Sequence, residues 1–254
     1  MRRVAWITGA SSGIGRALAL RMAASGWTVA VTARRAGELH ELAAQAPAGA
    51  ILPFAADVTD AAAMSAAVDG IEAQAGPIVQ AVLNAGVYLP VTAETFDAAI
   101  FRKSFDVNLM GAVNGLAPLL PRMIARRSGR IAVVASVAGY GGLPTSAAYG
   151  ATKAGLINLA ESLKFDLDRY GVTIQVVCPG FVETPATDDN PFPMPHLMKV
   201  EDAAARIEAG LATDAFEITF PRRFTYQLKL LQMLPYRAYF AMVARSTGWN
   251  RKQA

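Results

Sequence analysis

Short apolar runs alternate with longer helical patterns along most of this chain of 254 residues. The runs typical of strands cover residues 4–8, 28–32, 51–55, 81–83, 131–136, 172–178 and 216–220. Strands separated by helices of this length pair in parallel through right-handed crossovers. The alternation therefore predicts an α/β fold, with one doubly wound parallel sheet covered by helices on both faces.

Composition and length indicate one well-packed domain. Hydrophobic residues make up 53% of the chain and charged residues 17%, which suffices for a substantial core and excludes a disordered chain. No repeat or linker interrupts the strand–helix series. We expect a dinucleotide-binding and catalytic domain over residues 1–221, followed by a helical, basic extension over residues 222–254.

Several classes of protein are disfavoured by the residues that are scarce. The one cysteine, Cys178, lies in an apolar run, which indicates a buried thiol and a reducing compartment. With only His40 and His196 as histidines, we expect no metal site. The apolar run at the N-terminus is too short for a signal core, and no stretch is long enough to span a membrane, so the expected location is the cytoplasm.

A glycine-rich stretch follows the first predicted strand directly. Gly9, Gly13 and Gly15 are spaced as G-x-x-x-G-x-G, and a helical pattern begins at Ile14. Glycines at this point let the backbone approach a pyrophosphate, while the helix N-terminus supplies N–H groups and positive dipole. The stretch indicates a dinucleotide site in a Rossmann-type fold, although alone it is compatible with an ordinary strand–helix loop.

The end of the second strand favours NADP(H) over NAD(H). Sites for NAD usually carry an acid there, whereas a 2′-phosphate requires a cation. This chain has Arg34 and Arg35 at that point and no acid before Glu38. Guanidinium groups bind phosphate well, and the alternative is a pair of solvated arginines at a helix start.

Tyr149 and Lys153 are candidates for acid/base chemistry. Their spacing of four places both on one face of a helix, next to each other. A neighbouring ammonium stabilises a phenolate, so we expect Lys153 to lower the pKa of Tyr149 from about 10 toward neutrality. A phenol with such a pKa is a usable general acid or base, whereas an ordinary helix surface also offers such pairs.

Taken in order, these motifs resemble the classical short-chain dehydrogenase/reductase family. The resemblance covers about residues 4 to 185 and rests on matches in the expected order on the expected elements. They are Thr8-Gly9-Ala10-Ser11-Ser12-Gly13-Ile14-Gly15, Asp57-Val58, Asn84-Ala85-Gly86, Asn108, Ser136, Tyr149-x-x-x-Lys153, Pro179-Gly180 and Thr184.

The resemblance implies four catalytic residues. Tyr149 is expected to exchange a proton with the substrate oxygen, and Lys153 to lower its pKa and hold the nicotinamide ribose. Ser136 would polarise the carbonyl. Asn108, on a long helix expected from Phe96 to about Arg127 with Pro118 and Pro121 as kinks or boundaries, would support a water that links Lys153 to solvent.

The other matched positions would hold the cofactor. Residues of the glycine stretch would surround the pyrophosphate, Asp57 and Val58 would contact the adenine, and the stretch from Asn84 to Gly86 would shape the cleft. Residues after the sixth strand would approach the nicotinamide. The expected cofactor set is Gly9, Ser11, Ser12, Gly13, Ile14, Gly15, Arg34, Arg35, Asp57, Val58, Asn84, Ala85, Gly86, Tyr149, Lys153, Pro179, Gly180, Val182 and Thr184.

The chain departs from the family pattern after Thr184. A proline-rich segment from Asp188 to Pro195 stands where the family places its substrate lid. Apolar residues in and after it either line a pocket for an apolar substrate or pack the loop down, and we favour the second interpretation. They are Phe192, Met194, Leu197 and Met198.

The extension after residue 221 holds the positive charge of the chain. From Ile218 onward there is no acid, and the basic residues are Arg222, Arg223, Lys229, Arg237, Arg245, Arg251 and Lys252. Leucines at helical spacing predict a helix that Pro235 breaks, with apolar character to about Ala244. We favour docking on the domain or on a partner subunit, over contact of residues 222–252 with an anionic membrane. No nucleic-acid module accompanies the charge.

The predicted function is an NADP(H)-dependent oxidoreductase that interconverts a carbonyl and an alcohol on a hydrophobic small molecule. The resemblance implies a homodimer or homotetramer. The alternative is a non-catalytic dinucleotide-binding or redox-sensing protein on the same fold, because function belongs to the site and not to the fold. An epimerase or dehydratase commonly needs a larger substrate domain than this chain can supply.

Overall fold

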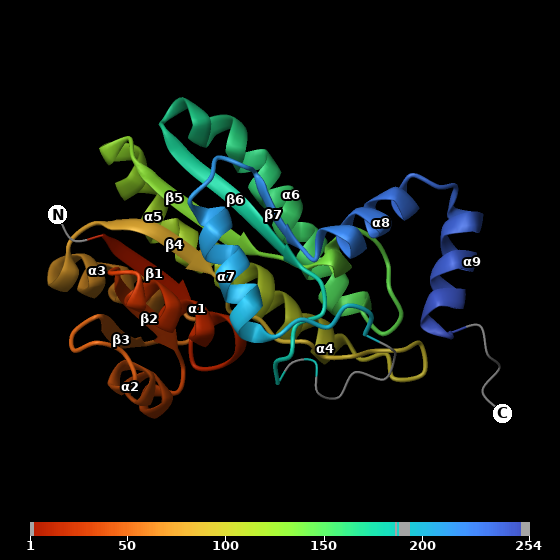
Figure 1. Cartoon of the computed structure of the whole chain (residues 1–254), viewed down its shortest axis with the longest axis horizontal. Coiled ribbons are helices and arrows are strands. Elements are labelled where there is room, and N and C mark those ends of the chain that lie inside the picture. The colour runs from red at the N-terminus through yellow and green to blue at the C-terminus, as the bar shows by residue number, and fades with distance from the viewer. Residues whose placement is uncertain (1–2, 186, 188–193, 250–254) are drawn as a thin grey trace.

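The protein is built around one seven-stranded parallel sheet with strand order β3-β2-β1-β4-β5-β6-β7 (Figure 1). This is a computed structural model, and it describes residues 3–185, 187 and 194–249. The strand order reverses between β1 and β4, which is the switch point at which such sheets bind ligands. The predicted doubly wound α/β fold is confirmed.

The strands agree with the apolar runs of the sequence to within a few residues. The central strands are buried on both faces, as parallel strands with helices on each side must be. Their bounds are β1 Val4–Thr8, β2 Thr28–Ala33, β3 Ile51–Ala55, β4 Ile78–Leu83, β5 Gly129–Val134, β6 Val172–Pro179 and β7 Glu217–Phe220.

Helices cover the sheet in two layers, each with its own apolar core. One layer consists of α1 Gly13–Ala24, α2 Ala36–Ala44 and α7 Val200–Leu211, and its core includes Leu18, Leu39 and Ile207. The other consists of α3 Ala61–Ala75, α5 Gly111–Arg126 and α6 Ala147–Arg169, with Val68, Leu119 and Leu156 in its core. In Figure 1, α7 crosses the near face of the sheet and α6 lies behind it.

The long helix expected around Asn108 is divided differently from the prediction. It consists of α4 Ala98–Ser104, the π-helical segment η1 Phe105–Met110 and α5. Pro118 and Pro121 lie inside α5, so they are not helix boundaries, and a kink at either stays a prediction. A proline inside a helix costs about 3 kcal/mol. Burial of the apolar face of α5 offsets this cost, since each large core side chain contributes about 1.5–3 kcal/mol.

The chain after β7 forms two helices at one end of the molecule. They are α8 Arg222–Gln232 and α9 Tyr236–Thr247, separated at Pro235 as the sequence predicts. Figure 1 shows α9 beyond α8 at the end of the long axis opposite to α2 and α3. Within the described ranges, no helix is long and apolar enough to cross a membrane. The division of the chain after residue 221 stays a prediction.

Candidate active site

One cavity of about 420 Å³ opens at the carboxyl ends of the strands, across the switch point of the sheet. The ends of six strands or the loops that follow them contribute to its wall. Of the predicted site residues, only Gly15 and Asn108 lie outside the lining. Those that line it are Gly9, Ser11, Ser12, Gly13, Ile14, Arg34, Arg35, Asp57, Val58, Asn84, Ala85, Gly86, Ser136, Tyr149, Lys153, Pro179, Gly180, Val182 and Thr184.

The loop between β1 and α1 makes a narrow cradle that depends on its glycines. Gly9 and Gly13 have φ of +66° and +54°, a left-handed backbone that side chains rarely adopt. A Cβ on Gly9 would lie 2.7 Å from the Cα of Ala85, and one on Gly15 would lie 2.5 Å from Nδ2 of Asn84. Gly15 therefore packs the loop against β4 from behind the cavity wall.

Hydrogen bonds hold this loop to the end of β4. Asn84 donates from Nδ2 to the carbonyl oxygens of Thr8 and Gly9, at 3.0 and 3.2 Å. The hydroxyl of Thr8 accepts from the backbone N–H groups of Asn84 and Ala85, at 3.0 and 3.2 Å. The sequence analysis did not assign Thr8 a role of its own, and its place in the matched motif was the only signal for one.

The first turn of α1 lies at the cavity wall, where Gly13 and Ile14 line it. Its N-cap residue, Ser12, makes no side-chain capping bond, and the first turn carries no acid. A helix start of this kind attracts anions through its N–H groups and its dipole. The cradle and this turn together fit the pyrophosphate of a dinucleotide.

Two arginines stand at the end of β2, where the sequence analysis expected them. Both are exposed and line the cavity. Arg35 donates to the hydroxyl of Ser11 at 3.1 Å and forms an ion pair with Glu38 at 2.6 Å. Arg34 has no carboxylate partner among the described residues, so its guanidinium is free for an external anion.

The remaining cofactor candidates lie on both sides of the switch point. Asp57 accepts hydrogen bonds from the N–H and hydroxyl of Thr59, each at 2.9 Å, so its carboxylate is fixed at the end of β3. On the other side, Thr184 lies across from the glycine loop, and a Cβ on Gly13 would be 3.3 Å from its methyl group. The two loops thereby narrow the cavity between them.

Tyr149, Lys153 and Ser136 come together in the deeper part of the cavity. Lys153 is buried, and its Nζ donates to the carbonyl oxygen of Val134 at 2.8 Å. The same Nζ lies 5.4 Å from the centre of the Tyr149 ring. Ser136 caps the short turn after β5, with its Oγ accepting from the N–H of Ala138 at 3.1 Å.

Burial, and not the neighbouring lysine, dominates the acidity of this pair. It raises the pKa of the half-buried Tyr149 to about 12, while a hydrogen bond from the Ser136 side chain acts in the opposite direction. Burial also lowers the pKa of Lys153 to about 8. The expectation of a phenol pKa lowered toward neutrality is therefore wrong for this structure, because removal from water penalises the phenolate more than Lys153 stabilises it.

Asn108 does not line the cavity, and its side chain makes hydrogen bonds to neighbouring segments. Its Oδ1 accepts from the N–H of Val87 at 2.7 Å, and Nδ2 donates to the Val87 carbonyl and to Thr152 Oγ1. It lies in the π-helical segment η1, a kind of irregularity that is frequent at functional sites. The side chain thus joins η1 to α6 and to the loop after β4, and the water relay stays a prediction.

The structure adds apolar and aromatic residues to the site that the sequence analysis did not select. Tyr88 packs edge-on against Tyr149, with 5.2 Å between ring centres, and its hydroxyl hydrogen-bonds to Thr145 at 2.7 Å. Leu143 and Phe181 also line the cavity. No motif marks these residues, since only the folded chain brings them to the same cavity as Tyr149.

The segment expected as a lid falls largely outside the described residues. Phe192 and the proline-rich stretch around it belong to that part. Among the described neighbours, Met198 packs against the core beside α7, and Leu197 is exposed. Among the described residues, none of the three lines the cavity, and only Met198 packs as the second interpretation expects, so that interpretation stays a prediction for the segment as a whole.

Known proteins were compared with the whole chain. The family described as short chain dehydrogenase matches residues 3–191. An uncharacterised oxidoreductase from Myxococcus xanthus is 37% identical over 245 residues, which is 96% of this chain and 97% of that protein. A 3-oxoacyl-(acyl-carrier-protein) reductase from Staphylococcus aureus is 36% identical over 191 residues, 74% of this chain and 78% of its own length.

A solved structure resembles the complete fold. A short-chain dehydrogenase from Streptomyces avermitilis superposes with a TM-score of 0.82 at 26% sequence identity, and the match covers 98% of each chain. The similarity therefore extends past residue 191, where the family match ends, into the chain's last helices.

Proposed function

This chain belongs to the short-chain dehydrogenase family and is thus an NAD(P)-dependent oxidoreductase; on that premise, we propose that it uses NADP(H) to interconvert a carbonyl and an alcohol on a hydrophobic small molecule. Members of this family act on small molecules and bind a nicotinamide dinucleotide. We further propose that it works in the cytoplasm as a homodimer or homotetramer. The buried single thiol of Cys178 supports a reducing compartment.

The observation that carries the proposal is the convergence of two sets of residues in one cavity. A cradle suited to a pyrophosphate forms one part of its wall, and the half-buried Tyr149, the buried Lys153 and Ser136 form another. When bound, a reduced nicotinamide supplies hydride to a carbonyl carbon. The residues at this end then have to stabilise and protonate the oxygen.

We propose that Tyr149 donates the proton that the substrate oxygen receives during reduction. As hydride reaches the carbon, negative charge develops on the oxygen, and hydroxyl donors already aimed at it lower the barrier. Ser136 and Tyr149 would donate those hydrogen bonds, and Tyr149 would pass its proton to the oxygen to complete the alcohol. With its pKa raised to about 12, the phenol holds its proton at neutral pH, which favours carbonyl reduction. Lys153, which with a pKa of about 8 still carries its charge for the most part at neutral pH, would stabilise the phenolate left behind.

The preference for NADP(H) rests on the cations at the end of β2. Arg34 is free of carboxylates in the described part of the chain, and Arg35 with Ser11 offers donors at one side of the cavity. A 2′-phosphate would bind to such donors with charge-assisted hydrogen bonds. Glu38 already neutralises part of Arg35, so Arg34 would carry more of the recognition.

An apolar substrate is supported by the wall beside Tyr149. Tyr88, Leu143 and Phe181 face the cavity near the proposed reaction centre. The Staphylococcus aureus relative is named for a 3-oxoacyl substrate, in which a ketone sits within an acyl chain. We therefore propose a ketone attached to an apolar chain or ring.

The test measures NADPH oxidation by absorbance against ketones graded by chain length and ring number. Tyr149→Phe should retain NADPH binding, and its turnover should fall by about 10²–10⁴-fold, the usual contribution of a positioned acid. The control is Tyr170→Phe, which alters a tyrosine at the far end of α6 and should leave turnover unchanged. Unchanged turnover in Tyr149→Phe refutes its role, and NADPH binding with no turnover on any ketone favours the non-catalytic alternative.

A further inference from the structure

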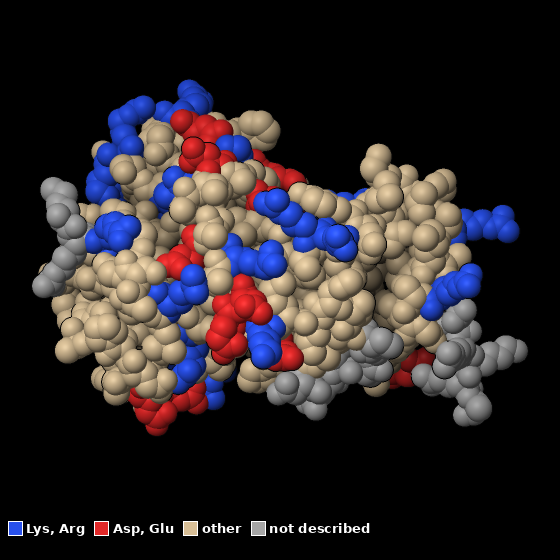
Figure 2. Space-filling view, in the orientation of Figure 1, with Lys and Arg blue, Asp and Glu red and all other residues tan. Residues whose placement is uncertain are grey.

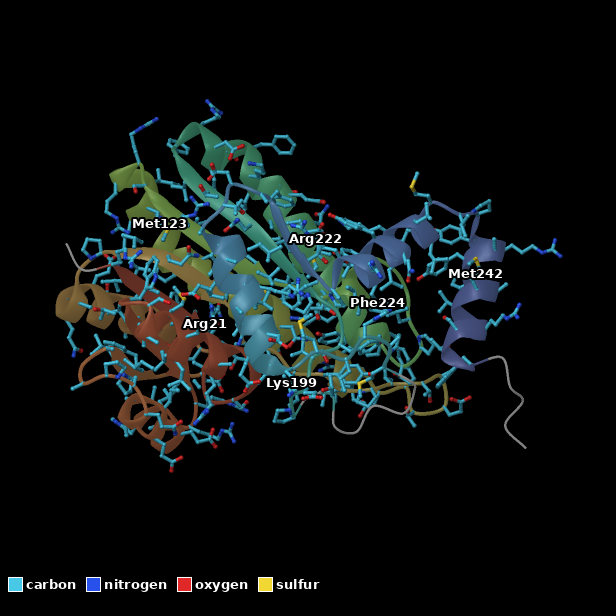
Figure 3. The ribbon with its side chains drawn as sticks, viewed as in Figure 1. Arg21, Met123, Lys199, Arg222, Phe224 and Met242 are labelled. Carbon is cyan, nitrogen blue, oxygen red and sulfur yellow. The ribbon has the colours of Figure 1, made fainter. Side chains whose placement is uncertain are left out.

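The helices α8 and α9 carry an apolar outer face that no described residue covers. Tyr226, Leu230 and Met233 follow one another at helical spacing and are all exposed, Met233 at 81%. Tyr236 and Phe240 continue the exposed side chains on α9, where their rings stack at 5.9 Å. Figure 3 places Met242, which is also exposed, on α9 away from the body of the molecule.

The opposite faces of these helices fix them to the domain. Phe224 of α8 packs on Phe181 with 5.7 Å between ring centres, and Lys229 forms an ion pair with Glu217 of β7. On α9, the hydroxyl of Tyr239 donates to the carbonyl of Gly142 at 2.9 Å. Only Thr225 of α8, and Tyr239 and Val243 of α9, are buried. The outer face is thus held in place while most of both helices stays uncovered.

Basic side chains accompany this apolar face without any acid. Arg222, Arg223, Arg237 and Arg245 are exposed, and none has a carboxylate partner in the described chain. We call these arginines, with Tyr226, Leu230, Met233, Tyr236 and Phe240, the tail face. In Figure 2 the visible side of α8 and α9 is tan with blue at its edges.

The position of three of these arginines opposes helix stability. Arg222 and Arg223 lie in the first turn of α8, and Arg237 lies in the first turn of α9, with no acid in either turn. The helix dipole is positive at that end and disfavours cations there. Stabilisation of the helices does not explain this arrangement, whereas attraction to an external anionic surface does.

We propose that the tail face binds an anionic lipid surface. Aromatic and aliphatic side chains between arginines suit the boundary of a bilayer, where apolar groups enter the acyl region and cations meet the headgroups. A second copy pairing through the same face would bring the arginines of both copies into one interface with no acid from that face to neutralise them, because a two-fold interface uses one patch on both subunits. This proposal concerns the surface alone and does not depend on the reaction.

The lipid would lie beside the apolar end of the cavity. Phe224 is on the inner side of α8, as Figure 3 shows, and its neighbour Phe181 lines the same cavity as Tyr149. A single helix therefore separates the tail face from the wall that we assign to an apolar substrate.

The experiment measures co-sedimentation of the full chain with lipid vesicles. Phosphatidylcholine vesicles should pellet little protein, whereas vesicles of equal parts phosphatidylcholine and phosphatidylglycerol should pellet it, and less so as salt rises. Arg222→Gln with Arg223→Gln should weaken partitioning roughly thirtyfold, because each cation near an anionic surface contributes about fivefold. The charge-matched control, Arg169→Gln with Arg206→Gln, removes two exposed cations from α6 and α7 and should bind normally.

Apolar variants test the other half of the face. Leu230→Ser with Met233→Ser should lose anionic-vesicle binding, whereas Phe165→Ser, which alters a side chain 78% exposed on α6, should retain it. Circular dichroism confirms that each variant is folded. The proposal is overturned if wild type fails to pellet with anionic vesicles, or if folded tail-face variants pellet as well as wild type. A dimer in size-exclusion chromatography that the Leu230 and Met233 changes dissociate would instead assign the face to a second copy.

Discussion

Replacement of Gly9 by alanine should lower the free energy of unfolding far more than the same replacement at another glycine with a similar left-handed φ. Gly9 has φ of +66°, and a Cβ there would lie 2.7 Å from Cα and 2.9 Å from N of Ala85. A left-handed backbone costs a residue other than glycine about 1–2 kcal/mol. The collision involves backbone that cannot rotate away, and overpacking of this kind costs about 1–3 kcal/mol. We expect Gly9→Ala to lower the free energy of unfolding by about 2–5 kcal/mol.

Gly26→Ala is the matched control for this change. Its φ of +82° is also left-handed, but nothing lies within 4 Å of the position that the added methyl group would take. Gly26→Ala should therefore lower the free energy of unfolding by only about 1–2 kcal/mol, which is the penalty for a left-handed backbone. Thermal unfolding measures both variants, since 1 kcal/mol corresponds to about 2–4 °C in Tm for a chain of this size.

Measurement of NADPH binding separates the two roles of the loop, which are to pack against Ala85 and to hold the cofactor. A shift of the loop away from Ala85 would widen the cradle, so Gly9→Ala should weaken NADPH binding while Gly26→Ala should not. Equal losses of Tm in the two variants would refute the close packing against Ala85. Normal NADPH affinity in a folded Gly9→Ala protein would refute the assignment of this cradle to the pyrophosphate.

Two further predictions concern charge in the cavity. Glu38→Gln should tighten NADPH binding about 1.4- to 5-fold without changing NADH binding, because an exposed ion pair that restrains Arg35 is worth about 0.2–1 kcal/mol. Arg34→Gln should weaken NADPH binding. Equal effects on NADPH and NADH binding in a fluorescence titration would contradict the assignment of these arginines to the 2′-phosphate. Lys153 has its pKa lowered to about 8 in the folded chain, so the unfolded chain binds more protons between about pH 8 and its ordinary value near 10.5. Stability of the wild type relative to Lys153→Met should therefore rise across that window, and urea unfolding at several pH values that gives a constant difference would disprove it.

The sequence was sufficient to predict the fold because each local signal agreed with the architecture. Apolar runs placed the strands, and the parallel alternation with helices left few topologies open. The same logic located most of the cavity lining, since motifs that follow parallel strands meet at one edge of the sheet. Pro118 and Pro121 do not end a helix, as they could have done, because burial of the α5 face outweighs the local preference of proline, and that burial depends on the whole fold.

Residues without a motif were not predictable, because their roles arise from contacts between distant segments. Tyr88 faces Tyr149, and Phe181 meets Phe224, only after the sheet has assembled. The helices α8 and α9 were also only partly predictable from the sequence. Its helical spacing was readable, but which side of α8 and α9 remains uncovered depends on the contacts of Tyr239 and Lys229 with the domain.

The acidity of Tyr149 shows how tertiary structure can reverse a correct local inference. Spacing on one helix face does bring Lys153 close, at 5.4 Å from the ring centre. The same burial that gives the pair its protected position also removes water from the phenolate and raises the pKa of Tyr149, and it lowers the pKa of Lys153 to about 8. On the acid/base role that we propose for Tyr149, a protonated phenol beside a mostly charged lysine is suited to giving a proton, which is the step that carbonyl reduction needs. Oxidation of an alcohol would require the phenolate first, and that form becomes available only as the pH rises or as additional positive charge enters the cavity.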